Sequence, residues 1–208
     1  VNSQIFDTLQ TAEYTYQSRL TASPGAEVFL RYSPNGRYLA FSHVGKNQEQ
    51  FDLSVIDMKT QSLHNLKSTG YSEEAPVWSA DGKWLAYYRY DPFSCTVRVF
   101  SVENAIEMWR LSPESTLFEC DPAHGPLPIF WPTDTALYTQ QWQESGIQVK
   151  HHEVLSSSGM RISNTTLLPR DIGYLKDINT ETGELLFSQL INGKQHLFKG
   201  RVEGGNIT

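Results

Sequence analysis

The sequence predicts an all-β fold built from repeated four-stranded antiparallel sheets. The main observation is that the stretch Tyr32–Phe41 (YSPNGRYLAF) returns 46 residues later as Trp78–Tyr87 (WSADGKWLAY). In both copies an aromatic residue precedes a small polar turn, a glycine, a cation and an apolar run. The glycine suits the positive φ of a tight hairpin, so each copy predicts a strand, a turn and a second strand. The chain is also rich in aromatic residues (12%), which is typical of many short strands.

The first two repeats are predicted over residues 26–69 and 70–126. Alternation of apolar residues between turn signals places four strands in each repeat. In the first repeat these are Val28–Tyr32, Arg37–Val44, Asp52–Met58 and Ser62–Lys67. In the second they are Ala75–Trp78, Lys83–Tyr90, Cys95–Ser101 and Ile106–Leu111. A proline-containing connection, Ser112–Pro128, follows and is a candidate contact surface because long loops are often functional.

Two weaker repeats are predicted over residues 127–169 and 170–208. The third begins at Ile129–Tyr138, where the hairpin glycine is missing, and continues through Ile147–Leu155. The fourth contains Asn179–Phe187 and Gln195–Val202, and ends one strand short. A repeat near 46 residues is typical of β-propeller blades. Residues 1–208 are therefore predicted to form a single propeller domain of about four blades.

The N-terminal segment Tyr14–Leu20 has the pattern of an extra strand. We expect it to complete the fourth blade and close the ring, because closure removes two exposed sheet edges. In such a ring the first strand of each blade lines the central channel and the fourth is outermost. The alternative is that these blades are an excerpt from a larger ring.

Composition argues against several classes of partner. The chain has 17 basic and 23 acidic residues, a net charge of −6, and no cluster of Lys or Arg. Nucleic-acid binding requires a concentrated basic face, so we expect none. No apolar run is long enough for a membrane helix, and the first residues do not resemble a signal peptide. Any membrane attachment is expected to come from a span outside this chain.

Candidate reactive groups are sparse. A Gly-x-Ser-x-Gly nucleophile elbow and a glycine-rich phosphate loop are both missing. His151, His152 and Glu153 are adjacent, but neighbours on a strand point to opposite faces, so a solvated strand surface is the simpler interpretation. Asp57, Asp81 and Asp134 are interpreted as turn residues rather than calcium ligands. We therefore expect no catalytic residue, no metal and no cofactor.

The tryptophans and the two cysteines each allow two interpretations. The tryptophans, which we expect to pack between blades rather than to stack on a ligand, are Trp78, Trp84, Trp109, Trp131 and Trp142. Cys95 and Cys120 are the two cysteines of the chain. They either remain free thiols or form a disulfide that closes a loop of about 25 residues.

The repeats resemble the β-propeller repeat of TolB. In the first copy the resemblance covers Arg19-Leu20-Thr21, Pro24-Gly25, Tyr32–Phe41 and Leu53–Asp57; in the second it covers Trp78–Lys83 and Val97–Ser101. The third and fourth copies match in strand spacing more than in residues. The resemblance is specific for the propeller class and not for function, because such folds host many activities.

The resemblance implies a protein that works outside the cytoplasm, in the periplasm. It implies a non-enzymatic sensing or protein-binding propeller, either a TolB-like scaffold or the periplasmic portion of a membrane-anchored transcriptional regulator similar to CadC and ToxR. A protein or small-molecule ligand would then bind at a face of the propeller. The alternative is an accessory propeller of a prolyl-oligopeptidase-type peptidase. An oxidising compartment would in turn favour the Cys95–Cys120 disulfide.

Overall fold

The computed structural model describes residues 20–22, 25–67, 69–108, 114–144, 146–155, 160–169, 173–203 and 206–207. The first sheet is antiparallel and contains four strands in chain order: β1 (Gly25–Tyr32), β2 (Tyr38–Gly45), β3 (Asp52–Asp57) and β4 (Ser62–Lys67). These strands agree with the predicted ones to within a few residues. The first repeat is therefore one complete four-stranded sheet.

The second sheet also has four strands, but its fourth strand was placed wrongly from sequence. It contains β5 (Ser72–Trp78), β6 (Trp84–Tyr90), β7 (Cys95–Ser101) and β8 (Glu114–Glu119). The predicted strand Ile106–Leu111 overlaps helix α1 (Val102–Met108) instead. Val102, Ala105 and Ile106 follow helical spacing and pack on the core between the first two sheets. The segment predicted as a long loop supplies β8 and a short 3₁₀ turn, η2 (Pro122–His124).

The third sheet is complete and the fourth is one strand short. The third contains β9 (Phe130–Thr133), β10 (Ala136–Gln143), β11 (Gly146–Leu155) and β12 (Arg161–Leu167). The fourth contains β13 (Tyr174–Ile178), β14 (Leu185–Ile191) and β15 (Lys194–Gly200). The chain then forms a separate short hairpin, β16 (Val202–Glu203) and β17 (Asn206–Ile207), in place of an outer strand on β15.

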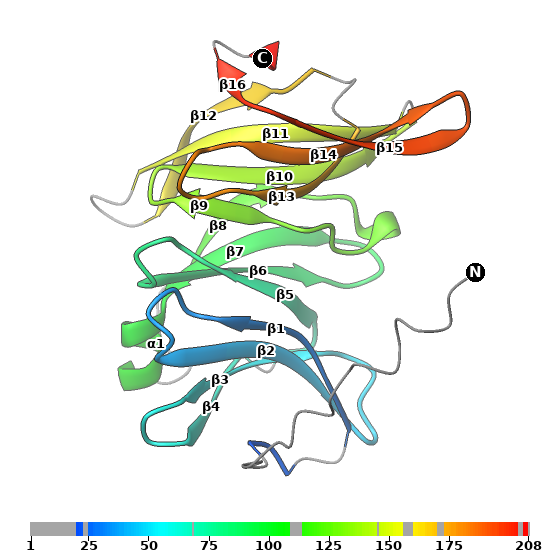
Figure 1. Ribbon diagram of the computed structural model, residues 1–208. Coiled ribbons are helices and arrows are strands. Elements are labelled where there is room, and N and C mark those ends of the chain that lie inside the picture. Colours follow the sequence, from blue (N-terminus) through cyan, green and yellow to red (C-terminus); the bar gives the residue numbers. More distant parts are fainter. Residues whose placement is uncertain are drawn as a thin grey trace, which may run out of the picture.

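The four sheets are stacked in chain order, with the first and the fourth at opposite ends (Figure 1). Each pair of neighbouring sheets encloses its own hydrophobic core. The described sheets thus form an open stack. The predicted closed four-bladed ring is not their arrangement, because the rotation between successive sheets leaves the first and the fourth sheet at opposite ends. The closing strand was predicted at 14–20; residues 14–19 lie outside the described residues, and Leu20 is not in a strand.

The repeated motif forms equivalent turns between the first two strands of the first and second sheets. Ser33 Oγ accepts from the Tyr38 N–H at 2.9 Å, and Asn35 Oδ1 accepts from the Arg37 N–H at 3.0 Å. In the second copy, Ser79 and Asp81 make the same contacts with the two residues after the glycine. Gly36 and Gly82 have φ of 68° and 70°, as the sequence predicted.

Neighbouring repeats are also joined directly. The Asp81 N–H donates to Asp134 Oδ1 at 2.8 Å, which ties the turn of the second sheet to that of the third. The Trp78 Nε1–H donates across the first interface to the Arg31 carbonyl at 3.0 Å. Among the described residues, the helices present are too short and too polar to cross a membrane.

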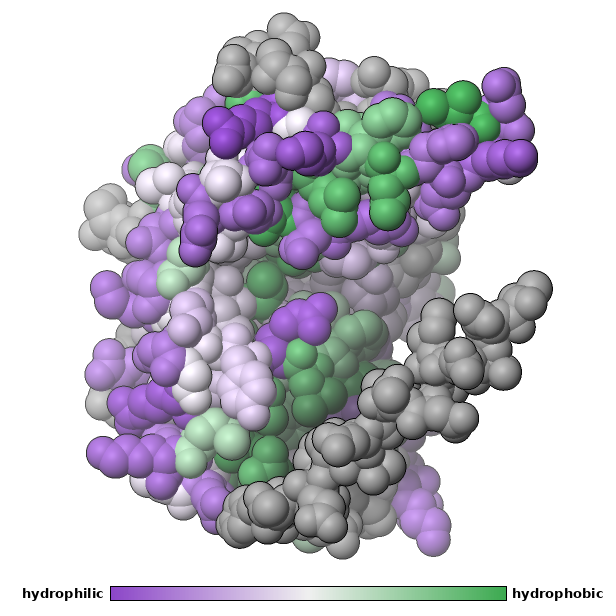
Figure 2. Space-filling model, in the orientation of Figure 1, coloured by the Kyte–Doolittle hydropathy of each residue, from purple (hydrophilic) through white to green (hydrophobic). Residues whose placement is uncertain are grey.

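The fourth sheet exposes apolar side chains at its end of the stack. Leu190 is 75% exposed and Leu197 is 66% exposed, and Leu186 on the same sheet is also exposed. Figure 2 shows hydrophobic residues over the hairpin that joins β14 and β15. By contrast, Leu185 and Phe187, which alternate with them on β14, are buried against the third sheet.

Candidate ligand-binding channel

The first strand of every sheet departs from regular pairing at its middle. On β1, Phe29 and Leu30 lie opposite one residue of β2, and on β5, Ala75 and Pro76 do the same against β6. The registers of β9 and β13 also shift, at 130–133 and 175–177. Such bulges re-aim side chains and are common beside functional sites.

Two of these bulges hold residues in the left-handed region. Phe29 has φ of 56° and Ala75 has φ of 53°, although both carry a Cβ. This conformation costs free energy for a non-glycine residue and persists where the surrounding structure imposes it. Pro76 fits at this place because each first strand is a sheet edge, where a missing N–H removes no sheet hydrogen bond.

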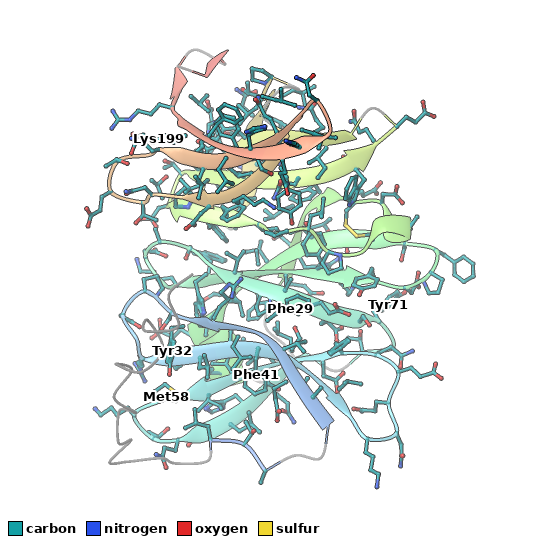
Figure 3. The ribbon with its side chains drawn as sticks, turned by 45° about the vertical axis from the view of Figure 1, so that its right-hand side comes forward. Phe29, Tyr32, Phe41, Met58, Tyr71 and Lys199 are labelled. Atoms are coloured by element: carbon teal, nitrogen blue, oxygen red, sulfur yellow. A yellow bond between two sulfur atoms is a disulfide. The ribbon has the colours of Figure 1, made fainter. Side chains whose placement is uncertain are left out.

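The four bulged strands converge on one cavity of about 530 Å³. Its lining includes Phe29 and Arg31 of β1, Trp131 of β9, and Lys176 and Asp177 of β13. Figure 3 shows Phe29 on the side of β1 that faces the second sheet. The segment before β9 contributes Pro126, Leu127 and Pro128, so the end of the predicted contact loop does reach this site. Its volume is within the range of small-molecule sites.

Two cations and one carboxylate line this cavity. Arg31 Nη1 donates to the neighbouring Leu30 carbonyl at 3.0 Å, and Lys176 Nζ lies 3.9 Å from the Tyr174 ring centroid. Asp177 Oδ1 accepts from the Ile178 backbone N–H. Within the described part of the chain, neither cation forms a salt bridge. The cavity is therefore positively charged in a protein whose net charge is −6.

Trp131 in the cavity wall has an unused hydrogen-bond donor. Its side chain is 5% exposed, and its Nε1 has no acceptor among the described residues. Trp78, the equivalent residue of the second repeat, donates to the inner strand of the preceding sheet. The Trp131 Nε1–H is therefore a buried donor that the described residues leave without an acceptor, and it is not exposed to the cavity.

The predicted disulfide residues lie away from this cavity. Cys95 begins β7 and Cys120 follows β8, and the structure joins them by a disulfide with a Cα–Cα distance of 4.9 Å. The Cys120 N–H also donates to the Cys95 carbonyl at 3.0 Å. The bond therefore links β7 covalently to the residue that follows β8, at the outer side of the second sheet.

The adjacent histidines are separated by the strand, as predicted, but one is not solvated. His152 is 3% exposed, and its two ring nitrogens lie 2.8 Å from Thr139 Oγ1 and 2.9 Å from Thr165 Oγ1. Its ring stacks on Phe118 of the second sheet. Burial lowers the pKa of His152 to about 4, so the ring is neutral at physiological pH. It acts as a core residue between two sheets.

A second buried titratable group lies at the other end of β5. Glu73 is fully buried, accepts from Thr69 Oγ1 at 2.5 Å through Oε1, and leaves Oε2 without a partner in the described residues. Burial raises the pKa of this carboxyl to about 7, with Asp52 adding to the effect and Arg89 opposing it. Next to it, Glu74 accepts from the Tyr90 hydroxyl at 2.5 Å.

The remaining sequence candidates have structural roles. Asp57 and Asp81 accept backbone N–H groups in their turns, as predicted for turn residues. Trp78 and Trp131 are buried between sheets, whereas Trp142 is 40% exposed, and Trp109 lies outside the described residues. The described residues contain no group of three or more His, Cys, Asp or Glu placed to hold a metal.

Sequence reasoning missed Phe29, Arg31 and Lys176. A signal was present for the first two strands, because Phe29 and Ala75 each stand three residues before the aromatic residue of the repeated motif. Aligning the repeats would have marked this position as equivalent. Nothing in the sequence indicated that it bulges, since neither Phe nor Ala is a typical residue for positive φ.

Comparison with known proteins shows the fold. Neither a protein-family model nor a curated protein matches the chain. Among solved structures, TolB from Acinetobacter baumannii matches with a TM-score of 0.64 at 10% identity, over 90% of this chain and 44% of that one. The β-propeller domain of the Trilobed protease from Pyrococcus furiosus matches with a TM-score of 0.63 at 13% identity, over 89% and 57%.

The fold is that of a β-propeller. A puromycin-hydrolyzing peptidase from Mycobacterium tuberculosis also matches, with a TM-score of 0.63 at 12% identity, over 88% of this chain and 31% of that one. This propeller chain thus spans 31 to 57% of the length of these three proteins. In propeller terms, β1, β5, β9 and β13 are the inner strands of four blades, and the cavity lies along these strands. We call it the channel cavity.

Proposed function

We propose that this chain is a non-catalytic propeller that works outside the cytoplasm and recognises a protein or a small ligand at the channel cavity. The observation that carries the proposal is the convergence of four bulged inner strands on one cavity. The cavity wall combines two cations, a carboxylate and aromatic rings, which are groups that bind and orient a ligand.

The disulfide supports the proposed location. Disulfides form and persist in oxidising compartments and are rare in the cytosol. The Cys95–Cys120 bond is compatible with a periplasmic domain, and the TolB-like fold supports the same compartment. We propose that the chain is either a TolB-like scaffold or the sensing portion of a membrane-anchored transcriptional regulator similar to CadC and ToxR.

Site-specific photocross-linking tests the binding role. A photoreactive phenylalanine analogue is placed at Phe29 in the channel cavity, and a matched control carries it at Phe93, which is 91% exposed and lies outside the cavity lining. Irradiation in cells of the source organism should give a discrete adduct from position 29 and not from position 93. Identical adducts from both positions, or none from either, would contradict the proposal.

The second candidate is an accessory propeller of a prolyl-oligopeptidase-type peptidase. The observation that favours it is the structural similarity to the puromycin-hydrolyzing peptidase and to the Trilobed protease propeller. The complete reading frame separates the two. A DNA-binding domain and one membrane span in the same frame support the regulator, whereas a hydrolase domain supports the peptidase.

A further inference from the structure

We propose that two copies of this chain pair through the free edge of β15, as antiparallel strands related by a two-fold axis. The inference goes beyond the proposed function, because β15 contributes no residue to the lining of the channel cavity. It rests on three features of the fourth blade, which are a missing outer strand, the direction of the backbone groups along β15, and the sequence of that strand.

The fourth blade lacks an outer strand among the described residues. In the other three blades the third strand pairs with an outer strand, β4, β8 or β12. The corresponding strand of the fourth blade, β15, pairs with β14 alone, and its hairpin extends beyond the third sheet (Figure 1). Residues 194–199 are all exposed, whereas every residue of β3 is buried. β15 is therefore a free sheet edge, which is a template for a further strand.

The turn before β15 determines which backbone groups face this edge. The two-residue turn at 192–193 has φ of 51° and 74°, the pattern of a type I′ hairpin, and Ile191 lies opposite Lys194. In such a turn the Lys194 N–H bonds to the Ile191 carbonyl, and the direction of the N–H and C=O groups then alternates along the strand. The residues whose backbone groups point to the free edge are therefore Gln195, Leu197 and Lys199.

A second β15 fits this edge better than an arbitrary strand, because the sequence is self-complementary in one register. Antiparallel pairing centred on Leu197 places Leu197 opposite its own counterpart and Lys199 opposite Gln195 of the second copy, so all three outward-facing residues are paired. Lys194 then lies opposite Gly200. β15 carries two lysines and no acidic residue, yet no lysine lies directly opposite another in this register.

The apolar side chains of β15 favour the same contact. Leu197 is 66% exposed and Phe198 is 36% exposed, and as neighbours on a strand they lie on opposite faces of the sheet. In the register centred on Leu197, the two leucines meet on one face, and each Phe198 lies opposite His196 of the second copy on the other. Pairing therefore removes apolar surface from water on both faces of the joined sheet.

Analytical ultracentrifugation of the whole chain tests the inference. Over loading concentrations from about 1 µM to about 500 µM, we expect a reversible equilibrium of monomer and dimer with a dissociation constant in the micromolar range or weaker, because the contact is a single strand. The weight-average mass should rise from 23.6 kDa toward twice that value. A chain that stays monomeric over this range would overturn the inference, whatever other strand occupies the edge.

A pair of leucine variants separates strand pairing from non-specific apolar contact. Leu197→Lys places two ammonium groups opposite each other at the two-fold axis and should weaken the dimer at least about tenfold. Leu190→Lys is the matched control, because Leu190 is 75% exposed but lies on β14, one strand in from the edge. The control should change the dissociation constant less than about twofold. Circular dichroism reports the fold of both variants, and equal effects from the two would contradict pairing at β15.

Hydrogen exchange tests the backbone contact itself. The amides of Gln195, Leu197 and Lys199 should exchange about tenfold more slowly when about nine-tenths of the chain is dimeric than at concentrations where it is monomeric. The amides of Lys194 and His196, which face β14, should not change. A dimer in which the three outward-facing amides keep their monomer exchange rates would overturn the inference.

Charge variants at Gln195 test the register. Gln195→Glu places a carboxylate opposite Lys199 of the second copy at two symmetric positions and should tighten the dimer about two- to tenfold, although Lys199 also forms a 3.5 Å ion pair with Glu184 of its own blade. Gln195→Lys should weaken the dimer by a similar factor. Gln143→Glu, at an exposed position of the third blade, controls for net charge. Equal responses to Gln195→Glu and Gln195→Lys would refute the register and the inference with it.

Discussion

The buried carboxyl of Glu73 makes the free energy of unfolding of this protein depend on pH. Its carboxyl has no solvent exposure, one hydroxyl donor and one oxygen without a described partner, an environment that favours the protonated acid. Because its pKa of about 7 in the folded state lies above the usual value of 4.5, the folded state binds the proton more tightly than the unfolded state. The stability that comes from the protonated form is complete below about pH 4.5 and is lost as pH rises through 7.

We therefore predict that Glu73→Gln stabilises the protein at alkaline pH. The amide is isosteric, keeps the acceptor for Thr69 and cannot ionise. At pH 8 the free energy of unfolding should rise by about 2–3 kcal/mol relative to the wild type, and at pH 4.5 the two should agree. Urea unfolding at several pH values measures this difference. Glu49→Gln, at an exposed position, is the control, and an equal gain there would refute the explanation.

At the scale of single elements, the outer part of the second sheet is the least regular. The sequence predicted a strand where α1 lies, because Ile106 and its neighbours are apolar enough for either structure. The helical spacing of Val102, Ala105 and Ile106 favours the helix over the strand, because in a helix all three side chains face the core between the first two sheets. Strand β8 then follows from the segment predicted as a loop and is tied to β7 by the disulfide.

We predict that removing this disulfide destabilises the domain. The bond closes a loop with a sequence separation of 25 residues, so the Cys95→Ala/Cys120→Ala variant should lose on the order of 3 kcal/mol of unfolding free energy in the chain-entropy model. Guanidinium unfolding with and without a thiol reductant measures the effect. The reductant should destabilise the wild type and leave the double variant unchanged; a wild type insensitive to reduction would contradict the prediction.

At the scale of the molecule, stability comes from cores between neighbouring blades. Each core is shared by two sheets, and the described sheets contact their neighbours in chain order, so the stack has two ends. On β14 the alternation of side chains separates Leu185, which is fully buried against the third blade, from Leu190, which projects into solvent. The same residue type therefore has opposite roles on one strand.

We predict that Leu185→Ala costs about 2–5 kcal/mol, the usual range for a leucine deleted from a packed core. Leu190→Ala, the matched change five residues away, should alter the free energy of unfolding by less than about 0.5 kcal/mol, as for other exposed sites. Thermal and urea unfolding of both variants provide the comparison. Equal costs would show that the exposed face of the fourth blade is covered in the folded protein.

The sequence alone determined most of the strands, the repeated turns and the blade repeat, but it misplaced the outer strand of the second blade. Turn chemistry and alternation are local, so Asn35–Gly36 and Asp81–Gly82 specify their hairpins wherever the sheets lie. Only the tertiary structure decided the open stack, the bulges at Phe29 and Ala75, and the placing of residues from β1 and β13 in the lining of one cavity. These features depend on the rotation between successive blades and on contacts between residues that are distant in the chain. A local pattern of residues specifies neither the rotation nor these contacts.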